Sequence, residues 1–210
     1  PNAIDLKNKN LSPSEEHILG TDYLGRDLLS RILIGARTSL SIAAGVVLIS
    51  LFLGTAAGCA AGYYGGLVDE SISRVIDIFL SFPSVIFALT IMGALGAGVF
   101  NLMLALSIVH WAKYARMMRG QVLSIKKQEF VLSAITGGAG DFYVIRKHIV
   151  PNAIATLLVL ATIDFGHVIL SIATLSFLGI GLPADVPEWG AMLSAGKEFM
   201  RTAPYQTIFP

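Results

Sequence analysis

Charged residues are scarce in this chain, and cysteine is almost missing. Only 14% of the 210 residues are Asp, Glu, Lys or Arg, while 54% are hydrophobic; a typical soluble domain is about 25% charged. The chain therefore lacks the polar cover that a protein needs to face water on all sides. A single cysteine, Cys59, excludes a disulfide framework and a cysteine-rich metal site within the chain. A net charge of only +1 argues against nucleic-acid binding, which calls for a basic field.

An initiator methionine, a secretory signal and a phosphate-binding loop are also missing. Residues 1–13 are polar and irregular, unlike a signal peptide, and the final stretch TAPYQTIFP contains no closing apolar segment. We expect an internal fragment of a longer protein that lacks a spanning helix at each end. The pattern GxxxxGK[ST] does not occur, so any nucleotide hydrolysis belongs to another chain.

Long apolar runs are what the chain does have, and its mean hydropathy is +0.71. A membrane-spanning helix needs about 20 mostly apolar residues. Four spans are predicted, at residues 39–61, 76–95, 98–113 and 152–178, with a kink at Pro83 in the second. Gly54, Gly58 and Gly62 recur every four residues at the end of the first span and just beyond it, which allows close helix packing. The sequence thus predicts an all-α, polytopic transmembrane helical bundle.

Basic residues are unevenly distributed between the loops. Lys and Arg gather in residues 113–151, whereas residues 179–196 contain none. The positive-inside rule makes the first of these loops cytoplasmic and the loop at 179–204 external. Counting spans backwards then places residues 1–38 outside as a segment before the transmembrane domain, residues 39–204. Arg26, Arg31 and Arg37 oppose this orientation, which follows the larger basic cluster.

The cytoplasmic loop contains the polar stretch EFVLSAITGGAGDFYVIRKHIVPN, residues 129–152. EFVLSAIT has helical character, Gly137-Gly138 breaks it, and Asp141 is predicted to cap a following helix. The pairs Phe130 with Ala134 and Val131 with Ile135 form an apolar stripe at i,i+4 spacing. Such a stripe either enters the groove of a partner or packs on the helix ends of the same chain.

This loop resembles the cytoplasmic EAA loop of binding-protein-dependent ABC importer permeases. The triplet of the family pattern falls on Leu132-Ser133-Ala134, its glycine on Gly138 and its final proline on Pro151. Leu132 stands where the pattern has Glu, and Ser133 where it has the first Ala. Glu129, one turn earlier, is a candidate replacement for the missing acidic residue.

The rest of the chain resembles the dipeptide/oligopeptide/nickel subfamily of these permeases, C-type subunit. The similar blocks are HILGTDYLGRDLLSRILIGARTSL, GYYGGLVDESISRVIDIFLSFPS, YARMMRGQVLS, LSFLGIGLP and PEWGAML, in order from His17 to Pro204. The resemblance implies a MetI-like core of a type I importer in the inner cell membrane. It also implies a related permease subunit as heterodimer partner, an external substrate-binding protein, and two cytoplasmic ATPases that hold ATP and Mg. No cofactor is expected in this chain.

The resemblance makes the short helix of the loop a coupling helix that contacts an ATPase. The residues implied in coupling are Glu129, Phe130, Val131, Leu132, Ser133, Ala134, Ile135, Gly138 and Pro151.

Asp164 and His167 are ionisable residues inside the fourth predicted span, and their i,i+3 spacing places them on one helical face. Such residues are costly at membrane depth unless they face a cavity or a partner. They either line the translocation path, with transient metal contacts, or form a structural hydrogen-bonded pair between helices. A carboxylate and one imidazole do not make a stable transition-metal site. The run ATIDFGHVIL around His167 resembles nickel-type permeases, and this resemblance implies nickel as the transported substrate. Small peptides are the alternative, and a membrane-embedded enzyme using this pair is a distant one.

Polar residues of the external segments form a second candidate site. The stretch GTDYLGRD has the composition of tight, self-hydrogen-bonded turns, and the resemblance adds docking of the binding protein. The predicted docking residues are Asp22, Arg26, Asp27, Glu188 and Trp189. His110, beside Trp111, is predicted to be a capping or interfacial group, and Arg74 to pair with Glu70.

Overall fold

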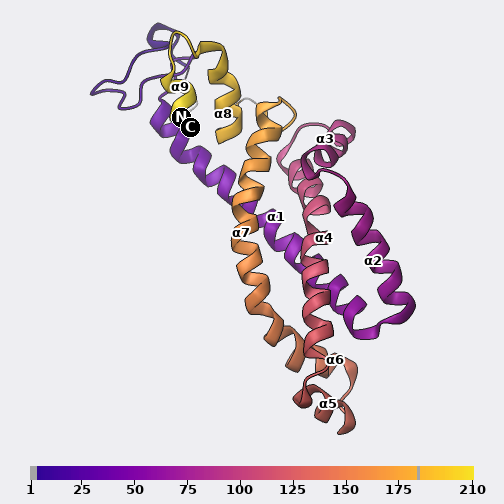
Figure 1. The fold of residues 1–210 in the computed structure, drawn as a ribbon. Helices are drawn as coiled ribbons and strands as arrows, with labels where there is room; N and C mark the ends of the chain where they lie inside the picture. The colour runs from indigo at the N-terminus through magenta and orange to yellow at the C-terminus, as the bar shows by residue number, and fades with distance from the viewer. Residues whose placement is uncertain (1–3, 184) are drawn as a thin grey trace. The chain divides into compact units, whose positions relative to one another are not determined.

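The computed structural model describes residues 4–183 and 185–210, and most of these residues fold into helices (Figure 1). The α-helices are α1 (Leu28–Tyr64), α2 (Gly66–Ser81), α3 (Ser84–Leu95), α4 (Val99–Ile125), α5 (Glu129–Thr136), α6 (Asp141–Val144), α7 (Val150–Phe177), α8 (Trp189–Gly196) and α9 (Tyr205–Ile208). Short 3-10 turns, η1 (Leu6–Asn8) and η3 (Lys197–Phe199), and a π-helical turn, η2 (Ile145–Ile149), complete the regular structure. The all-α prediction is confirmed.

Two helical runs in the described part of the chain are long and apolar enough to cross a membrane. They are α1 and the run from Asp141 to Phe177, which includes α7; the bent pair of α2 and α3 raises the number to three if it counts as one span. The fourth predicted span, residues 152–178, falls within the second run except for its last residue, and the third, residues 98–113, falls within α4 except for its first. The count of four spans and the assignment of inside and outside remain predictions.

The second predicted span, residues 76–95, is broken rather than kinked. α2 and α3 are bent by 92° at the residues between them. Phe82 is extended, with ψ 142°, because the ring of Pro83 disfavours a helical conformation in the residue before it. The predicted interruption at Pro83 is confirmed as a break between two helices, and the two helices as one span remain a prediction.

The first helix begins at Leu28 instead of Ser39. The Oδ2 atom of Asp27 accepts a hydrogen bond of 2.8 Å from the backbone N–H of Ser30, so Asp27 satisfies a free amide of the first turn. Part of the predicted external segment is therefore helical.

The chain divides into two compact units. The terminal unit comprises the described residues of 1–45, 88–105 and 167–210, and the central unit comprises residues 46–87 and 106–166. α2, α5 and α6 belong to the central unit, and α8 and α9 to the terminal unit, whereas α1, α4 and α7 contribute to both.

Within the central unit, α1 packs closely on α4 through its glycines. A Cβ atom at Gly58 would lie 2.4 Å from the backbone oxygen of Ala115, and one at Gly54 would lie 2.6 Å from that of Trp111. Both distances are too short for any side chain, so the glycines allow the two backbones to approach. The close packing predicted from the glycine spacing is confirmed.

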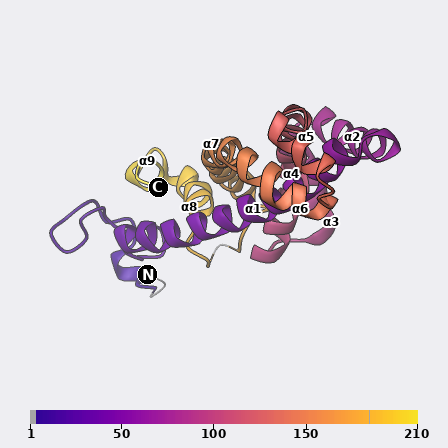
Figure 2. The same cartoon turned by 90° about the horizontal axis from the view of Figure 1, so that it is seen from below.

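α2 lies beside α4 in the same unit, as Figures 1 and 2 show. Ile76, Ala112 and Ala115 form a buried cluster there, and Phe79 stacks edge-on against Trp111. Two ion pairs join the helices along their length. The guanidinium of Arg119 binds Asp69 through two nitrogens, and that of Arg116 binds Asp77. The exposed pair predicted between Glu70 and Arg74 is also present, at 3.6 Å.

Candidate functional site

The short helix α5 begins and ends where local sequence chemistry requires. It spans Glu129–Thr136, and Gly137 forms its C-cap. Gly138 follows with φ +85°, a left-handed conformation that glycine adopts without steric cost. The predicted helix and glycine turn are therefore confirmed. The predicted cap of the next helix is wrong: Gly140 holds the N-cap position of α6, and Asp141 is its first residue.

The side chains of α5 are exposed except on one narrow face. Val131 is fully buried and is the only buried residue of this helix. Phe130, Leu132 and Ile135 are 45%, 49% and 38% exposed. The predicted stripe is thus divided: Val131 packs on the chain itself and anchors α5, while its apolar neighbours remain largely uncovered. We call Phe130, Leu132 and Ile135 the α5 apolar surface.

Aromatic and polar contacts hold the loop that carries α5. The ring of His148, in η2, lies 6.0 Å from that of Phe130 and 5.7 Å from that of Tyr143. At the end of α1, the hydroxyl of Tyr63 donates a 2.9 Å hydrogen bond to Asp141. The ammonium of Lys126 donates to the backbone oxygen of Tyr63 and lies 5.0 Å from the centre of its ring. α1 is therefore tied to both ends of the loop.

Removing the hydroxyl in Tyr63→Phe is expected to loosen the loop without unfolding the protein. A hydrogen bond to a charged group contributes about 1.5–3 kcal/mol to stability, and the contribution is smaller where the carboxylate is as exposed as that of Asp141. Opening of the loop should therefore become about fivefold more frequent. The measurement is the rate of limited proteolysis between residues 126 and 150. The matched control is Tyr64→Phe, whose exposed side chain should leave that rate unchanged; an equal acceleration in both variants would contradict the assignment.

The second polar cluster of the central unit centres on Asp164 of α7. Its carboxylate is only 2% exposed. His110 Nδ1 lies 2.9 Å from Oδ2, and Lys113 Nζ lies 3.1 Å from Oδ1; both partners come from α4. His110 is 1% exposed, whereas the side chain of Lys113 is 37% exposed. A buried carboxylate is thus matched by two donors from one neighbouring helix.

Asp164 was predicted from the sequence as a site residue, but its partners were not. The structural alternative, a hydrogen-bonded pair between helices, is present, and its donors are His110 and Lys113. The prediction for His110 was wrong, since it lies inside α4 and is buried, neither capping a helix nor facing an interface. The available signal was the i,i+3 spacing of His110 and Lys113 on one helical face, but nothing in the sequence showed that this face meets α7.

His167 lies three residues after Asp164 in α7, in the terminal unit, and its side chain is exposed. Its backbone oxygen accepts a hydrogen bond from the hydroxyl of Ser171. No group of three or more His, Cys, Asp or Glu residues gathers within residues 4–183 and 185–210 to hold a metal ion. A role of Asp164 and His167 in lining the path remains a prediction.

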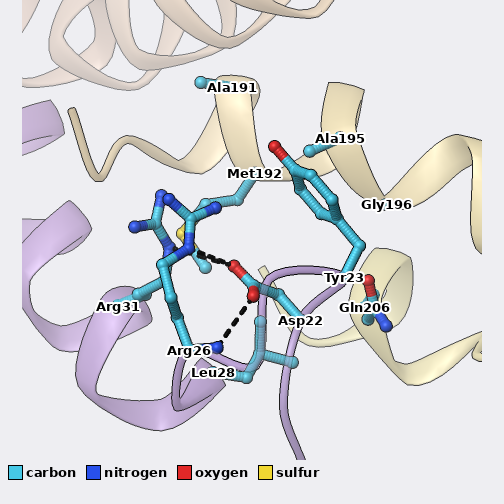
Figure 3. A pocket seen from close by; sticks show the side chains of 10 residues that line it. All are labelled: Asp22, Tyr23, Arg26, Leu28, Arg31, Ala191, Met192, Ala195, Gly196 and Gln206. Atoms are coloured by element: carbon cyan, nitrogen blue, oxygen red, sulfur yellow. Dashed lines mark hydrogen bonds and ion pairs between the residues drawn. The ribbon is translucent and has the colours of Figure 1, made fainter. Parts of the chain in front are cut away.

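In the terminal unit, the predicted docking residues Asp22 and Arg26 are turned inward. Both are 6% exposed. Arg26 Nε lies 2.7 Å from Asp22 Oδ2, and Arg31 Nε, on α1, lies 3.7 Å from the same oxygen. Figure 3 shows both guanidinium groups beside this carboxylate, next to a small cavity that Met192 of α8 also lines. These side chains hold the loop against the start of α1.

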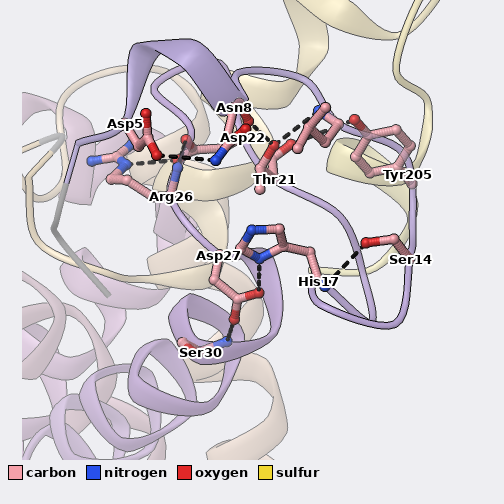
Figure 4. A network of polar contacts seen from close by, with 11 residues as sticks. Asp5, Asn8, Ser14, His17, Thr21, Asp22, Arg26, Asp27, Ser30 and Tyr205 are labelled. Carbon is pink, nitrogen blue, oxygen red and sulfur yellow. Dashed lines mark hydrogen bonds and ion pairs between the residues drawn. The ribbon is translucent and has the colours of Figure 1, made fainter.

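Asp27 belongs to a neighbouring polar network (Figure 4). It accepts hydrogen bonds from Ser30 and pairs with His17 Nδ1 at 3.0 Å. Burial disfavours the charge of Asp27, but the hydrogen bonds from Ser30 and His17 outweigh burial and hold its pKa below the ordinary value. The carboxylate therefore stays charged at neutral pH and keeps the first turn of α1 in place.

Glu188 and Trp189 fasten α8 to α1. Glu188 is 1% exposed, and its carboxylate accepts hydrogen bonds from the backbone N–H groups of Gly190 and Ala191 and from the hydroxyl of Ser39. The indole N–H of Trp189 donates to the backbone oxygen of Ile32 at 3.2 Å. Docking by the five external residues remains a prediction; the contacts described give all of them internal partners.

Three features together define a class of protein. They are apolar helices long enough to span a bilayer, a charged cluster buried between two helices, and a helix with exposed apolar side chains on a polar loop. The class is that of a membrane-embedded subunit that works with other polypeptides. The model of the family "Binding-protein-dependent transport system inner membrane component" matches residues 54–208. The chain belongs to this family: it is the inner-membrane permease subunit of an ABC importer, and ATP hydrolysis takes place in separate subunits.

Individual relatives agree with this membership. The chain is 43% identical over 210 residues to the nickel transport system permease protein NikC of Escherichia coli (strain K12), covering 100% of this chain and 76% of that protein. It is 42% identical over 203 residues to the dipeptide transport system permease protein DppC of Alkalihalophilus pseudofirmus, covering 97% of this chain and 67% of that protein. A solved inward-facing conformation of the MetNI methionine ABC transporter shares the fold, with a TM-score of 0.68 at 18% identity over 85% of this chain and 84% of that chain.

Proposed function

We propose that this chain is a permease subunit of a nickel importer and that α5 is its contact with a cytoplasmic ATPase. The complete importer then contains a second, related permease subunit, two ATPase subunits that bind ATP and magnesium, and an external substrate-binding protein. The nickel ion passes between the two permease subunits.

The observation that carries the proposed contact is the α5 apolar surface. One residue of this helix, Val131, is buried in the chain, whereas Phe130, Leu132 and Ile135 are exposed. A short exposed helix with apolar side chains suits a groove in another protein. When two ATPases close around ATP, a helix seated in such a groove moves with them, and the path changes between inward-open and outward-open states.

Nickel is supported by two observations. The relative whose printed function is nickel transport is similar over the whole of this chain. His167 presents an exposed imidazole on α7, and imidazole nitrogen is a preferred ligand of Ni²⁺. A path must release what it carries, so weak ligands suit it better than a complete metal site. Dipeptide transport is the second candidate, because the dipeptide permease is almost equally similar.

The experiment compares uptake of radiolabelled nickel and of a radiolabelled dipeptide in cells that lack this subunit. Restoring the gene is expected to restore nickel uptake. The variant His167→Ala is expected to lower nickel uptake several-fold with unchanged membrane abundance, while Thr162→Ala, an exposed change on the same helix, leaves it intact. Restored dipeptide uptake without nickel uptake would replace nickel by the second candidate, and wild-type nickel uptake by His167→Ala would remove His167 from the path.

A further inference from the structure

The carboxylate of Asp164 is held at both of its oxygens by one neighbouring helix. Oδ2 is bound by His110 Nδ1 at 2.9 Å and Oδ1 by Lys113 Nζ at 3.1 Å. The carboxylate and the imidazole are each 2% exposed. A buried carboxylate is stable in this position only while both partners contact it, because removing one partner leaves a buried charge that nothing compensates.

The two donors restrict the movement of α7 relative to α4 as well as compensating the charge of Asp164. His110 and Lys113 are three residues apart in α4, so they lie about one helical turn from each other on the same face. A carboxylate bound from two points on a helix resists sliding along that helix and rotation about its own axis. α7 and α4 should therefore move as one body at this level.

The imidazole of His110 depends on this contact for its orientation. Its Nε2 atom is buried and has no hydrogen-bond partner among the described residues. Nδ1 therefore makes the one hydrogen bond shown for the ring, and its acceptor is Asp164. Loss of the carboxylate leaves both ring nitrogens without a protein partner in this cluster.

Asp164 lies on a continuous helical run that begins at Asp141, and the glycine turn joins the start of this run to α5. η2 leads directly into α7, which starts at Val150, and Asp164 lies about 21 Å along α7 at 1.5 Å per residue. A displacement of α5 is thus carried by the loop into α7 and along it to the Asp164 contact.

We propose that Asp164, His110 and Lys113 are positioning residues that transmit the movement of α5 from α7 to α4, so that opening of the path follows ATP hydrolysis. The proposal rests on the proposed role of α5 but is independent of the substrate. Movement of α7 alone would consume ATP without opening the path, whereas the joint movement of α7 and α4 rearranges two of its helices.

The test uses the complete transporter reconstituted in liposomes, with the solute that the wild type carries. Asp164→Asn keeps the size of the side chain and removes its charge. Solute transported per ATP hydrolysed should fall about tenfold, within the 5–150-fold range usual for coupled sites, while Asp164→Glu should retain much of the wild-type ratio. The matched control is Asp77→Asn, which breaks an exposed ion pair with the same helix, α4, and should leave the ratio unchanged.

A double variant separates positioning from folding. Asp164→Asn with Lys113→Met removes both charges, so the protein should accumulate in the membrane like the wild type, yet the transport ratio should stay low. If transport and ATP hydrolysis fall in proportion in Asp164→Asn, or if the double variant restores the ratio, the proposal is overturned.

Distances between spin labels give a readout that does not depend on the solute. Labels at Leu123 of α4 and Leu158 of α7, both exposed, are attached in a Cys59→Ala background. The wild type should keep one distance with and without ATP, and Asp164→Asn should show a second distance when ATP is added. An unchanged single distance in Asp164→Asn would overturn the positioning role of Asp164 even where the role of α5 holds. A wild type that hydrolyses ATP without transporting nickel or dipeptide would instead count against the proposed function.

Discussion

Replacing the α5 apolar surface with serine, in the triple variant Phe130→Ser, Leu132→Ser and Ile135→Ser, is expected to abolish uptake while the protein remains in the membrane. Burying one apolar side chain in a groove contributes about 1.5–3 kcal/mol to binding. Three substitutions therefore remove about 4.5–9 kcal/mol, whereas a micromolar complex is held by only about 8 kcal/mol. Val131, which holds α5 in the chain, is unchanged, so the fold of the loop should survive.

The measurements are ATP-dependent uptake and co-purification of the ATPase subunits with the tagged permease. A matched control replaces Ile4, Leu6 and Ile18 with serine; these side chains are at least as exposed but lie far along the chain from α5. The control should retain its ATPase subunits. Normal ATPase recovery from the α5 variant would show that the apolar surface faces some other partner.

The second large effect is expected from Gly58→Ala, because the added methyl group meets backbone rather than a movable side chain. Its Cβ would lie 2.4 Å from the oxygen of Ala115 and 2.7 Å from the Cβ of Met118. α1 and α4 would have to separate, at a cost of about 1–3 kcal/mol or more in the free energy of unfolding. The contacts of Gly54 and Gly62 with α4 would loosen as well.

Thermal unfolding of the purified protein tests this expectation. A loss of 1 kcal/mol lowers Tm by about 2–4 °C in a chain of this size, so Gly58→Ala should fall by at least several degrees. Gly120→Ala is the matched control, since Gly120 also lies within a helix and its Cβ would meet nothing within 4 Å. The control should equal or exceed the wild type, because alanine favours helix over glycine by about 1 kcal/mol. Equal Tm values for both variants would refute close packing at Gly58.

Features set by neighbouring residues could be predicted from the sequence. The end of α5 follows from Gly137-Gly138, and the interruption near Pro83 from the geometry of proline. The close packing at Gly54, Gly58 and Gly62 could also be predicted, because three glycines four residues apart indicate a helix–helix contact. They do not indicate which helix is the partner. The angle at Pro83 could not, since packing beyond the break determines where the following helix goes.

Contacts between distant parts of the chain could not be predicted. Asp164 clearly needed a partner, but His110 and Lys113 lie more than 50 positions earlier, and periodicity shows only that they share a face. Asp141 has the right residue type for a cap, yet its carboxylate binds Tyr63 of α1. In the same way, charged residues of the terminal loop suggested an outward surface, while Asp22 and Arg26 bind each other in the interior.

The π-helical turn η2 makes the length of the loop as important as its composition. One residue more or fewer before an α-helix rotates everything after it by about 100°, and a π turn absorbs one such extra residue. Removing one residue from Ile145–Ile149 would leave an ordinary α-helical turn, whereas removing one residue of α7 between Val150 and Asp164 would turn the carboxylate by about 100° away from His110. The π turn can therefore lose a residue that α7 cannot, because only the regular helix beyond it fixes the direction in which Asp164 points.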